Sequence, residues 1–598
     1  MIELNEEQKE MLAGKQGVAR QMAMRLVLDM AAAAGAEALL PIHSAHLSGV
    51  SPLTGGMGLR RFLARLSEDP QARVAVPTTL NAAGCDAAHF DEMRITAPDF
   101  LEHSLEIVAR YEALGVRPTQ SCVPYEWEGV VTEGNAAWAE SNAICFGNSY
   151  CGLHTNRESG LSALAAALTG YTPDYGLLQE EARRPNLEVT VTAGLSDPTD
   201  FSILGDWFGK QVEPAWHLPF GPIPLIKGLP EAPNHEQKKA LTAAAANYGC
   251  PLLYLAGEEG IPAGEIEGTL TFTASDLAQR YQELAPMGPV SLVTIGCPQA
   301  SVGELRAAAE LLQGKTVRAD PAPAGSPPPL WIFTSSHNKA IAERTGLAEV
   351  IRESGALLLE NTCPEVVPYD QRWVHQILTN SMKAEHYIKS GLNGIPTAVM
   401  TLADCVAVAT GEREIRDQRL EIAKAKEEDK RGDTRAVATS TPAPAMETRE
   451  PATGGFVAAG RGLPSQGEFR VQGEAFVTGT PITLLGFVNR ETGVIEEAGH
   501  PADGQSMANK IAIFPKGSGS TVAPYVLLEL YYRGRAPLAI ANTDIDQQSA
   551  PACSLENIPY AYAFDGDIIG NVNNGDLVEL SRAGETVSLR VLERATTG

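Results

Sequence analysis

Three of the nine cysteines stand close to prolines in segments typical of turns: Ser121-Cys122-Val123-Pro124, Gly296-Cys297-Pro298 and Thr362-Cys363-Pro364. Proline ends regular structure, so each thiol is expected at a strand end or in a loop, where distant segments can converge. Three thiolates at one point suit an iron–sulfur cluster with one iron open to a substrate oxygen. The alternative is that each is a small buried apolar side chain, and without a CxxC pair the spacing does not decide.

A second candidate is the Gly/Ser-rich loop Phe514–Thr521, which follows the strand-like run Lys510–Phe514. Such a loop between a strand and a helix can turn several backbone N–H groups onto one point, and helix N-termini favour anions. Ser520 would lie near that point, where its hydroxyl or alkoxide could meet a substrate proton. The alternative is a plain flexible turn. Neither the GxxxxGK[ST] spacing of a P-loop nor a GxSxG nucleophile elbow occurs there.

Short polar side chains gather in His43–Ser51 and again in Pro77–Asn81, at expected strand ends. Such positions commonly line pockets in α/β folds. His43 and His46 could act as acid or base, although a pair of histidines is more often structural. The segment Trp138–Asn142 is similarly polar within an apolar context, which structural hydrogen bonding would also explain.

The elements that must position these residues are those of a large, acidic globular protein. At roughly 150 residues per domain, a chain of 598 residues predicts about four domains or subdomains. The net charge of −26 argues against general affinity for nucleic acid or anionic membranes. The acidic N-terminus is unlike a secretory signal, and no apolar run approaches the roughly 18 residues of a spanning helix. The nine widely spread cysteines are unlike a small disulfide framework, so we expect a cytoplasmic protein with reduced thiols.

Helical and strand-like patterns alternate over residues 1–430, which favours layered α/β sheets. Helices are predicted at Val18–Ala34, Leu161–Leu168 and Val302–Leu312, and strands at Ala72–Val76, Leu187–Val191 and Val290–Ile295. Residues 431–455, rich in Pro, Ala, Thr and Gly, are typical of a linker. Residues 456–598 predict a smaller β-rich α/β domain, with strands at Glu468–Val471, Pro481–Val488, Lys510–Phe514 and Val587–Leu592 and a helix at Ala523–Leu528.

Together these motifs resemble the aconitase X family, a branch of the aconitase superfamily. The residues that carry the resemblance are Pro41–Ser51, Val76–Asn81, Trp138–Ser141, Thr155–Glu158, Ser162–Gly170, Gly296–Pro298, Asn361–Cys363, Gly499–Pro501, Phe514–Pro515 and Gly517–Val522. The resemblance implies an aconitase-like large part of several subdomains, residues 1–430, and a small-subunit-like swivelling domain, residues 456–598.

The family contains a two-chain dehydratase of mevalonate 5-phosphate and a single-chain dehydratase of cis-3-hydroxy-L-proline. Both parts share one chain here, which favours a hydro-lyase that converts cis-3-hydroxy-L-proline to pyrroline-2-carboxylate. The alternatives are dehydration of mevalonate 5-phosphate and a non-catalytic iron–sulfur binding or sensing protein. The implied partner is a small amino acid, with no nucleic acid or membrane, and the protein is expected to be a monomer or homo-oligomer.

The resemblance also implies roles for individual residues. Cys122, Cys297 and Cys363 would hold the cluster, of the [2Fe-2S] type by likeness to single-chain relatives, with [3Fe-4S] and [4Fe-4S] as alternatives. Cys85 stands where many relatives have another residue, and it could line the site or replace a ligand. Ser520 would be the catalytic base. The residues expected to hold the substrate are Ser48, Gly49, Val50, Ser51, Asn81 and Lys383, with a solvated surface position as the alternative for Lys383.

Overall fold

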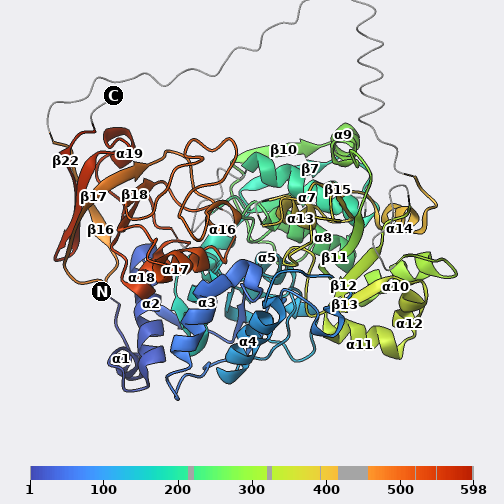
Figure 1. Ribbon diagram of the computed structural model, residues 1–598, viewed down its shortest axis with the longest axis horizontal. Helices are drawn as coiled ribbons and strands as arrows, with labels where there is room; N and C mark the ends of the chain where they lie inside the picture. Colours follow the sequence, from blue (N-terminus) through green and yellow to red (C-terminus); the bar gives the residue numbers. More distant parts are fainter. Residues whose placement is uncertain are drawn as a thin grey trace, which may run out of the picture.

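The computed structural model describes residues 2–212, 221–229, 231–318, 326–390, 392–414, 455–518, 520–546 and 548–595. Within these ranges, three units built on parallel sheets are followed by a barrel, coloured from blue to red in Figure 1. The mixed α/β class expected from the alternating pattern is confirmed. The predicted linker lies outside the described residues except for Gly455, and so does the predicted end of the body, residues 415–430.

The first unit is a parallel sheet with the strand order β3-β2-β4-β5, accompanied by the antiparallel pair β1-β6. Its elements are α1 (Glu6–Leu12), α2 (Val18–Ala34), β1 (Leu39–Pro41), β2 (Ser44–Leu47), α3 (Pro52–Leu66), β3 (Thr78–Leu80), α4 (Phe100–Ala113), β4 (Gly134–Trp138), α5 (Ser141–Tyr150), β5 (Leu153–His154), α6 (Gly160–Thr169) and β6 (Tyr171–Pro173).

The second and third units are parallel sheets with the orders β10-β7-β8-β9 and β13-β12-β11-β14-β15. The second contains β7 (Leu187–Val191), α7 (Pro198–Val212), β8 (Pro224–Lys227), α8 (His235–Ala246), β9 (Tyr254–Leu255), β10 (Gly268–Phe272) and α9 (Ala274–Leu284). The third contains β11 (Leu292–Ala300), α10 (Val302–Leu312), β12 (Leu330–Thr334), α11 (Ser336–Arg344), α12 (Leu347–Glu353), β13 (Leu357–Glu360), β14 (Ile377–Thr379), α13 (Met382–Ile388), β15 (Thr397–Val399) and α14 (Leu402–Thr410).

The tail is a closed barrel with the order β16-β20-β19-β18-β17-β21-β22. Its elements are β16 (Val457–Gly462), β17 (Phe469–Val477), α16 (Leu484–Phe487), β18 (Ile511–Phe514), α17 (Pro524–Tyr532), β19 (Ala539–Asn542), α18 (Ala550–Glu556), β20 (Tyr560–Tyr562), α19 (Ile568–Asn571), β21 (Leu577–Ala583) and β22 (Thr586–Glu593). The β-rich α/β domain predicted for this region is therefore confirmed.

Several predicted elements match closely. The helix predicted at Val18–Ala34 is α2, and it ends at Gly35, whose φ of 69° suits a left-handed C-cap. The strand predicted at Leu187–Val191 and the helix predicted at Val302–Leu312 have the observed bounds of β7 and α10.

Two predicted strands are wrong. Residues 72–76 form an irregular segment, because Val74 and Ala75 donate their N–H groups to Leu114 and Ala167 near helix ends, and the strand begins only after Pro77. Residues 481–488 also do not form a strand, since Gly486, at a φ of 87°, breaks the extended backbone. Neither apolar run joins a sheet, and of residues 72–76 only Ala72 is buried.

One apolar core runs from the first unit into the tail. It includes Leu59 and Leu63 of α3 together with Tyr525 and Leu528 of α17, all fully buried. Helix α17 packs on α3 and α18 on α2, and Figure 1 shows the tail lying against the first unit. The tail is thus docked through burial of apolar surface, the main stabilising term in folding and association.

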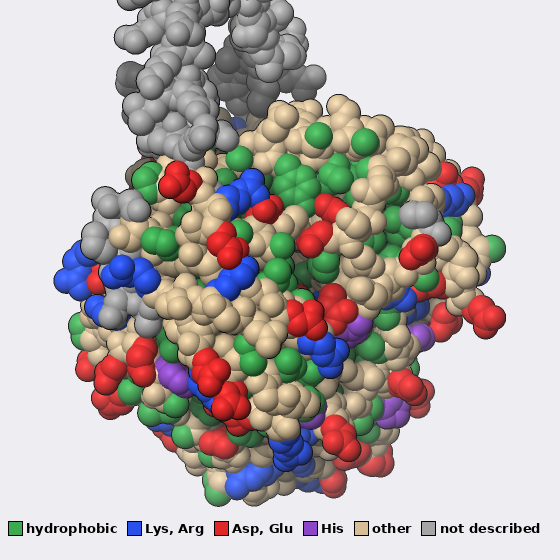
Figure 2. All heavy atoms as spheres, turned by 90° about the vertical axis from the view of Figure 1, so that its right-hand side faces the viewer, with side chains coloured by type: hydrophobic (Ala, Val, Ile, Leu, Met, Phe, Trp, Pro, Cys, Tyr) green, Lys and Arg blue, Asp and Glu red, His purple; other side chains and the backbone are tan. Residues whose placement is uncertain are grey.

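Among the described residues, no helix is long and apolar enough to cross a membrane. On the face seen in Figure 2, acidic side chains (red) and basic side chains (blue) are interspersed over the surface. All nine cysteines are free thiols.

Candidate active site

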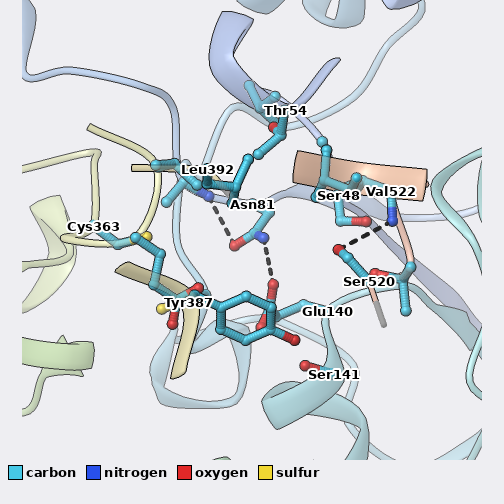
Figure 3. Close-up of a pocket in the computed structure, with 18 of the residues that line it drawn as sticks. Ser48, Thr54, Asn81, Glu140, Ser141, Cys363, Tyr387, Leu392, Ser520 and Val522 are labelled. Carbon is cyan, nitrogen blue, oxygen red and sulfur yellow. Dashed lines mark hydrogen bonds between the residues drawn. The ribbon is translucent and has the colours of Figure 1, made fainter. Parts of the chain in front are cut away.

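A pocket lies where the tail meets the body, and about 650 Å³ of space, including part of its open mouth, lies between its walls. The first and third units supply part of the wall, and the tail supplies the rest from the loop before α17 and from Leu485 of α16 (Figure 3). All the predicted site residues line this pocket except Ser51 and Cys85: Ser48, Gly49, Val50, Asn81, Cys122, Cys297, Cys363, Lys383 and Ser520.

Three thiols from distant segments share the pocket. Cys122 follows α4, Cys297 lies within β11, and Cys363 follows β13, and all three are buried. The Sγ of Cys122 accepts the N–H of Gln299 at 3.3 Å, and the thiol of Cys297 donates to Oε1 of Glu365 at 2.8 Å. Burial raises the pKa of Cys122 to about 12 and the pKa values of Cys297 and Cys363 well above their usual range. The charge of Lys383 lowers these three pKa values but does not outweigh burial, so the thiols stay protonated.

The three thiols are close enough to affect one another electrostatically. A charge on Cys122 would raise the pKa of Cys363, and a charge on Cys363 would raise the pKa of Cys297. Among the described residues, no group of three or more His, Cys, Asp or Glu side chains is arranged to hold a metal ion. A cluster contains several metal atoms and therefore spans wider gaps between thiolates than one ion does. The donor set of three thiols on one cavity is chemically suited to such a group.

Cys85 lies outside this set. Its side chain is buried among apolar residues that include Met93 and Phe100, and it does not line the pocket. Burial raises its pKa to about 11. The structure therefore places Cys85 in an apolar core cluster that also contains Cys297, outside the lining of the pocket.

Lys383 is a buried member of a charge network. Its Nζ lies 2.6 Å from Oε1 of Glu140, 2.5 Å from Oδ1 of Asn142 and 3.5 Å from Oε1 of Glu365. Only 2% of the residue is exposed, so the solvated surface alternative is wrong. Burial alone would lower the pKa of Lys383, but the charges of Glu140 and Glu365 raise it well above its usual range. Most of its hydrogen-bonding capacity is already used by protein groups.

Glu140 connects this network to Asn81, which donates from Nδ2 to Glu140 Oε2 at 2.5 Å (Figure 3). Burial alone would raise the pKa of Glu140, but the charge and hydrogen bond of Lys383 outweigh it and lower that pKa. The opposite holds for Glu365, whose pKa burial raises despite Lys383. The network thus contains one carboxylate that stays charged and one that takes up a proton more readily.

The turn from β2 into α3 forms another wall. Gly49 has a φ of 91°, and a Cβ there would lie 2.2 Å from Cε2 of Tyr525, so only glycine allows the tail to approach so closely. The Oγ of Ser48 is buried without a hydrogen-bond partner among the described residues. A buried hydroxyl of this kind in a pocket is a natural contact for a polar ligand.

Ser51 and the histidines have structural positions. Ser51 caps α3 by accepting the Leu53 N–H at 3.2 Å, and its hydroxyl donates to the Val366 carbonyl at 3.0 Å. His43 is exposed, whereas His46 is fully buried in β2 with Nδ1 2.8 Å from Oγ1 of Thr79. Neither histidine lines the pocket.

Ser520 reaches the pocket from the tail. Its Oγ accepts the Val522 N–H at 3.4 Å, and α17 begins four residues later at Pro524 (Figure 3). The next residue, Thr521, donates its hydroxyl to the Ala139 carbonyl at 2.6 Å and accepts the Gly160 N–H at 3.0 Å. The loop is therefore pinned to the body, and the positive end of the α17 dipole lies near the Ser520 hydroxyl.

Among the lining residues that were not singled out as site residues from the sequence are Glu140, Glu365, Tyr387 and Thr521. Some signal was present. Glu140 stands inside the polar segment Trp138–Asn142, and Glu365 lies two residues after Cys363. Tyr387 is four residues after Lys383, which puts both side chains on one face of α13.

Comparison with known proteins agrees with this architecture. The family models of the aconitase X first, third and swivel domains match residues 1–181, 290–411 and 464–589. The phosphomevalonate dehydratase large subunit of Methanosarcina mazei is 35% identical over 422 residues, covering 69% of this chain and 98% of that protein. The cis-3-hydroxy-L-proline dehydratase of Pseudomonas aeruginosa is 33% identical over 422 residues, covering 67% of this chain and 69% of that protein.

A solved structure and a small subunit extend the likeness. The crystal structure of Thermococcus kodakaraensis aconitase X in its holo-form matches with a TM-score of 0.61 at 32% identity, covering 68% of this chain and all of that one. The phosphomevalonate dehydratase small subunit of Methanosarcina acetivorans is 33% identical over 110 residues, covering 18% of this chain and 76% of that protein.

Proposed function

The chain belongs to the aconitase X family and is a dehydratase, and we propose that its substrate is cis-3-hydroxy-L-proline, converted to pyrroline-2-carboxylate and water. We assign residues 1–430 as the body that carries an iron–sulfur cluster, residues 431–455 as the linker and residues 456–598 as the domain that carries the base. We place the enzyme in the cytoplasm, where its thiols stay reduced.

The charge of the pocket supports an amino-acid substrate. Lys383 is the only cationic side chain among the described lining residues, and it is paired with Glu140 and Asn142. A phosphate dianion would enter without an Arg or Lys free to meet it. A cyclic amino acid has a positive ammonium group that balances its own carboxylate, so its charge suits a pocket that already contains Glu140 and Glu365.

The residues of the chain divide the reaction between them. Ser520 takes the α-proton, and the neighbouring backbone N–H groups and the α17 dipole stabilise its alkoxide. The Ser48 hydroxyl and the Asn81 amide bind and orient the substrate, and Lys383 holds Glu140 charged in its place. Cys122, Cys297 and Cys363 would hold the cluster, which supplies a Lewis acid for the departing 3-hydroxyl group when it is bound. The [2Fe-2S] form is our first assignment for this cluster.

A second candidate is the dehydration of mevalonate 5-phosphate. It is favoured by the 35% identity to a phosphomevalonate dehydratase large subunit, compared with 33% to the hydroxyproline enzyme. Backbone N–H groups can also bind phosphate, and the turn Ser48–Ser51 precedes a helix. A third possibility, a non-catalytic iron–sulfur sensor, predicts no turnover of either compound.

The test is product formation by protein purified without oxygen. We expect cis-3-hydroxy-L-proline to yield pyrroline-2-carboxylate, trapped as its coloured aminobenzaldehyde adduct, while trans-4-hydroxy-L-proline yields none. Mevalonate 5-phosphate is assayed in parallel for loss of water. Turnover of mevalonate 5-phosphate alone would overturn the substrate assignment, and turnover of neither by cluster-loaded protein would favour the sensor.

The role of Ser520 is tested in the same assay. We expect Ser520→Ala to lower kcat by about 1,000-fold, the scale of general-base catalysis, and to leave iron content unchanged. Ser518→Ala is the matched control, because Ser518 lies in the same loop but its Oγ lies 2.7 Å from the hydroxyl of Thr483. Equal losses in both variants would contradict a catalytic role for Ser520.

A further inference from the structure

The loop that carries Ser520 lacks regular structure of its own, so other segments must hold it in place. After β18 ends at Phe514, one side of the loop pairs with the segment before α16. The Ser518 N–H donates to the Ile482 carbonyl at 2.9 Å, and the Ile482 N–H donates to the Lys516 carbonyl at 3.2 Å. These two bonds fix the loop from one side only.

On the other side lies the carboxylate of Asp546, of which 3% is exposed. Burial raises the pKa of this carboxyl group, and the hydrogen bonds that it accepts lower it. It accepts the N–H groups of Gln548 at 2.9 Å and Ser549 at 3.1 Å, the Ser549 hydroxyl, and the N–H of Gly517 in the Ser520 loop. A buried carboxylate without a cation is costly unless several donors satisfy it, and here one of those donors belongs to the loop.

Gly517 is the residue that makes this contact possible. A Cβ at Gly517 would lie 3.0 Å from Oδ2 of Asp546 and 2.9 Å from Oε1 of Gln548, closer than side-chain carbons normally come. The first glycine of the Gly517–Ser520 stretch thus allows the backbone to approach the carboxylate. The chain just before Asp546 also contacts the start of the Ser520 loop, since the Thr543 hydroxyl donates to the Pro515 carbonyl at 3.3 Å.

We propose that Asp546 is a positioning residue that sets the orientation of the Ser520 loop through the N–H of Gly517. The proposal rests on the proposed role of Ser520 as the base. Asp546 does not line the pocket, so it acts only through its contact with the backbone of the Ser520 loop. A shift of about 1 Å in a catalytic group can cost about 100-fold in rate, so a contact three residues from Ser520 is enough to control turnover.

The test is a double-mutant cycle with Asp546→Asn and Ser520→Ala, assayed anaerobically with cis-3-hydroxy-L-proline. Asparagine keeps one oxygen but points an amide group at N–H donors. We expect Asp546→Asn to lower kcat by about 10- to 100-fold with KM changed less than about twofold. In the Ser520→Ala background we expect it to change kcat less than about twofold, because a residue that acts through Ser520 has nothing left to position. Equal losses in the two backgrounds, or an unchanged kcat, would overturn the proposal.

A second measurement separates this proposal from the substrate assignment. Hydrogen exchange of a peptide that covers residues 514–523 should speed up in Asp546→Asn, while peptides from the body exchange as in the unmodified protein. Asp503→Asn is the control, because Asp503 is an exposed acidic residue of the tail. If the substrate is wrong, no variant turns over but the exchange difference remains. Exchange that speeds up throughout the tail, or not in this peptide, would overturn the positioning role.

Discussion

Several charged side chains and thiols of this protein are buried. The Cys122, Cys297 and Cys363 thiols have raised pKa values because they are buried, yet they share one cavity and no disulfide. Metal binding removes the thiol protons and so resolves the cost of burial. Cys85 is equally buried, but it lies outside the pocket, among apolar residues together with Ser104 and Asp86.

The thiols therefore separate into two predicted groups. We expect Cys122→Ser, Cys297→Ser and Cys363→Ser each to lose most of the bound iron and sulfide, because each removes one of the proposed ligands. Cys85→Ser should keep both. Iron and sulfide assays with visible absorption spectra of anaerobically purified protein measure this directly. If Cys85→Ser lost the iron and sulfide while Cys363→Ser kept them, Cys85 would replace Cys363 in the proposed set of ligands.

His46 predicts a dependence of stability on pH. Burial lowers its pKa to about 4 from 6.5, and its Nε2 has no partner in the described part of the chain. Below pH 6.5 His46 takes up a proton in the unfolded chain but not in the folded protein. The free energy of unfolding therefore decreases as the pH is lowered from about 6.5 to about 4. The contribution lost between pH 7.5 and 5 is about 2 kcal/mol.

The measurement is the free energy of unfolding at those two pH values for the unmodified protein and for His46→Asn, which can keep a hydrogen bond to Thr79. The variant should lack this part of the pH dependence. His375→Asn, at an exposed position, should follow the unmodified protein. Parallel pH curves for His46→Asn and the unmodified protein would show that His46 does not titrate in this way.

At the scale of elements, the contact between α17 and the turn from β2 to α3 brings Ser520 to the pocket that the three thiols line. Gly49 permits it by leaving room for the Tyr525 ring. The Tyr525 hydroxyl in turn donates to the Ser48 carbonyl at 3.3 Å, so the aromatic side chain is held from two directions. Helix α17 of the tail thus packs against the turn between β2 and α3, whose backbone leaves room for it only because residue 49 is glycine.

We expect Gly49→Ala to destabilise the protein more than Gly35→Ala. Both glycines have positive φ, at 91° and 69°, so both variants carry a similar backbone strain. Only Gly49 has a ring atom within 2.2 Å of the new Cβ, whereas Gly35 has nothing within 4 Å. The difference should be about 1 to 3 kcal/mol, the usual cost of overpacking. Chemical denaturation measures the free energy of unfolding of each variant. Equal destabilisation by the two substitutions would contradict the prediction, because it would mean that the interface accommodates the new methyl group.

Predictability from the sequence also differs from element to element. Helix α2 and strand β7 have clear patterns and clear ends, and their bounds were predictable. The apolar runs at residues 72–76 and 481–488 were not, because periodicity cannot tell a strand from an irregular segment. The nearby prolines correctly placed Cys122 and Cys363 outside strands, whereas Cys297 lies within β11 and not at a strand end or in a loop as predicted. The pairing of Lys383 with Glu140 joins residues far apart in the chain and requires the fold.

For the whole molecule, the tail and the body share one apolar core and several polar contacts. Arg490 is a central one, since its guanidinium donates to the carbonyls of Leu53 at 3.0 Å and Thr54 at 2.8 Å and pairs with Glu529 at 3.3 Å. Asp29 of α2 accepts hydrogen bonds from Ser465 and Ser554. Such an interface is expected to hold without the covalent connection.

We therefore expect the two parts to stay together when residues 431–455 are replaced by a protease site and cut. The cleaved protein should elute as one species on gel filtration and keep its turnover. Arg490→Gln should promote separation on dilution, because it removes the bonds to α3, whereas Arg533→Gln, which contacts Glu529 and Glu491 within the tail, should not. Separation of the unmodified protein after cleavage would show that the connection is needed for docking.

The pocket has walls from both ends of the chain, and this has a consequence for the enzyme at low abundance. Two subunits on separate chains must find each other, so their active fraction falls as the protein is diluted. When both parts are on one chain, the effective concentration of each part at the other is on the order of millimolar, whatever the number of molecules in the cell. Each translated chain then provides one Ser520 loop for each set of three thiols, and the active fraction does not depend on balanced expression of two genes.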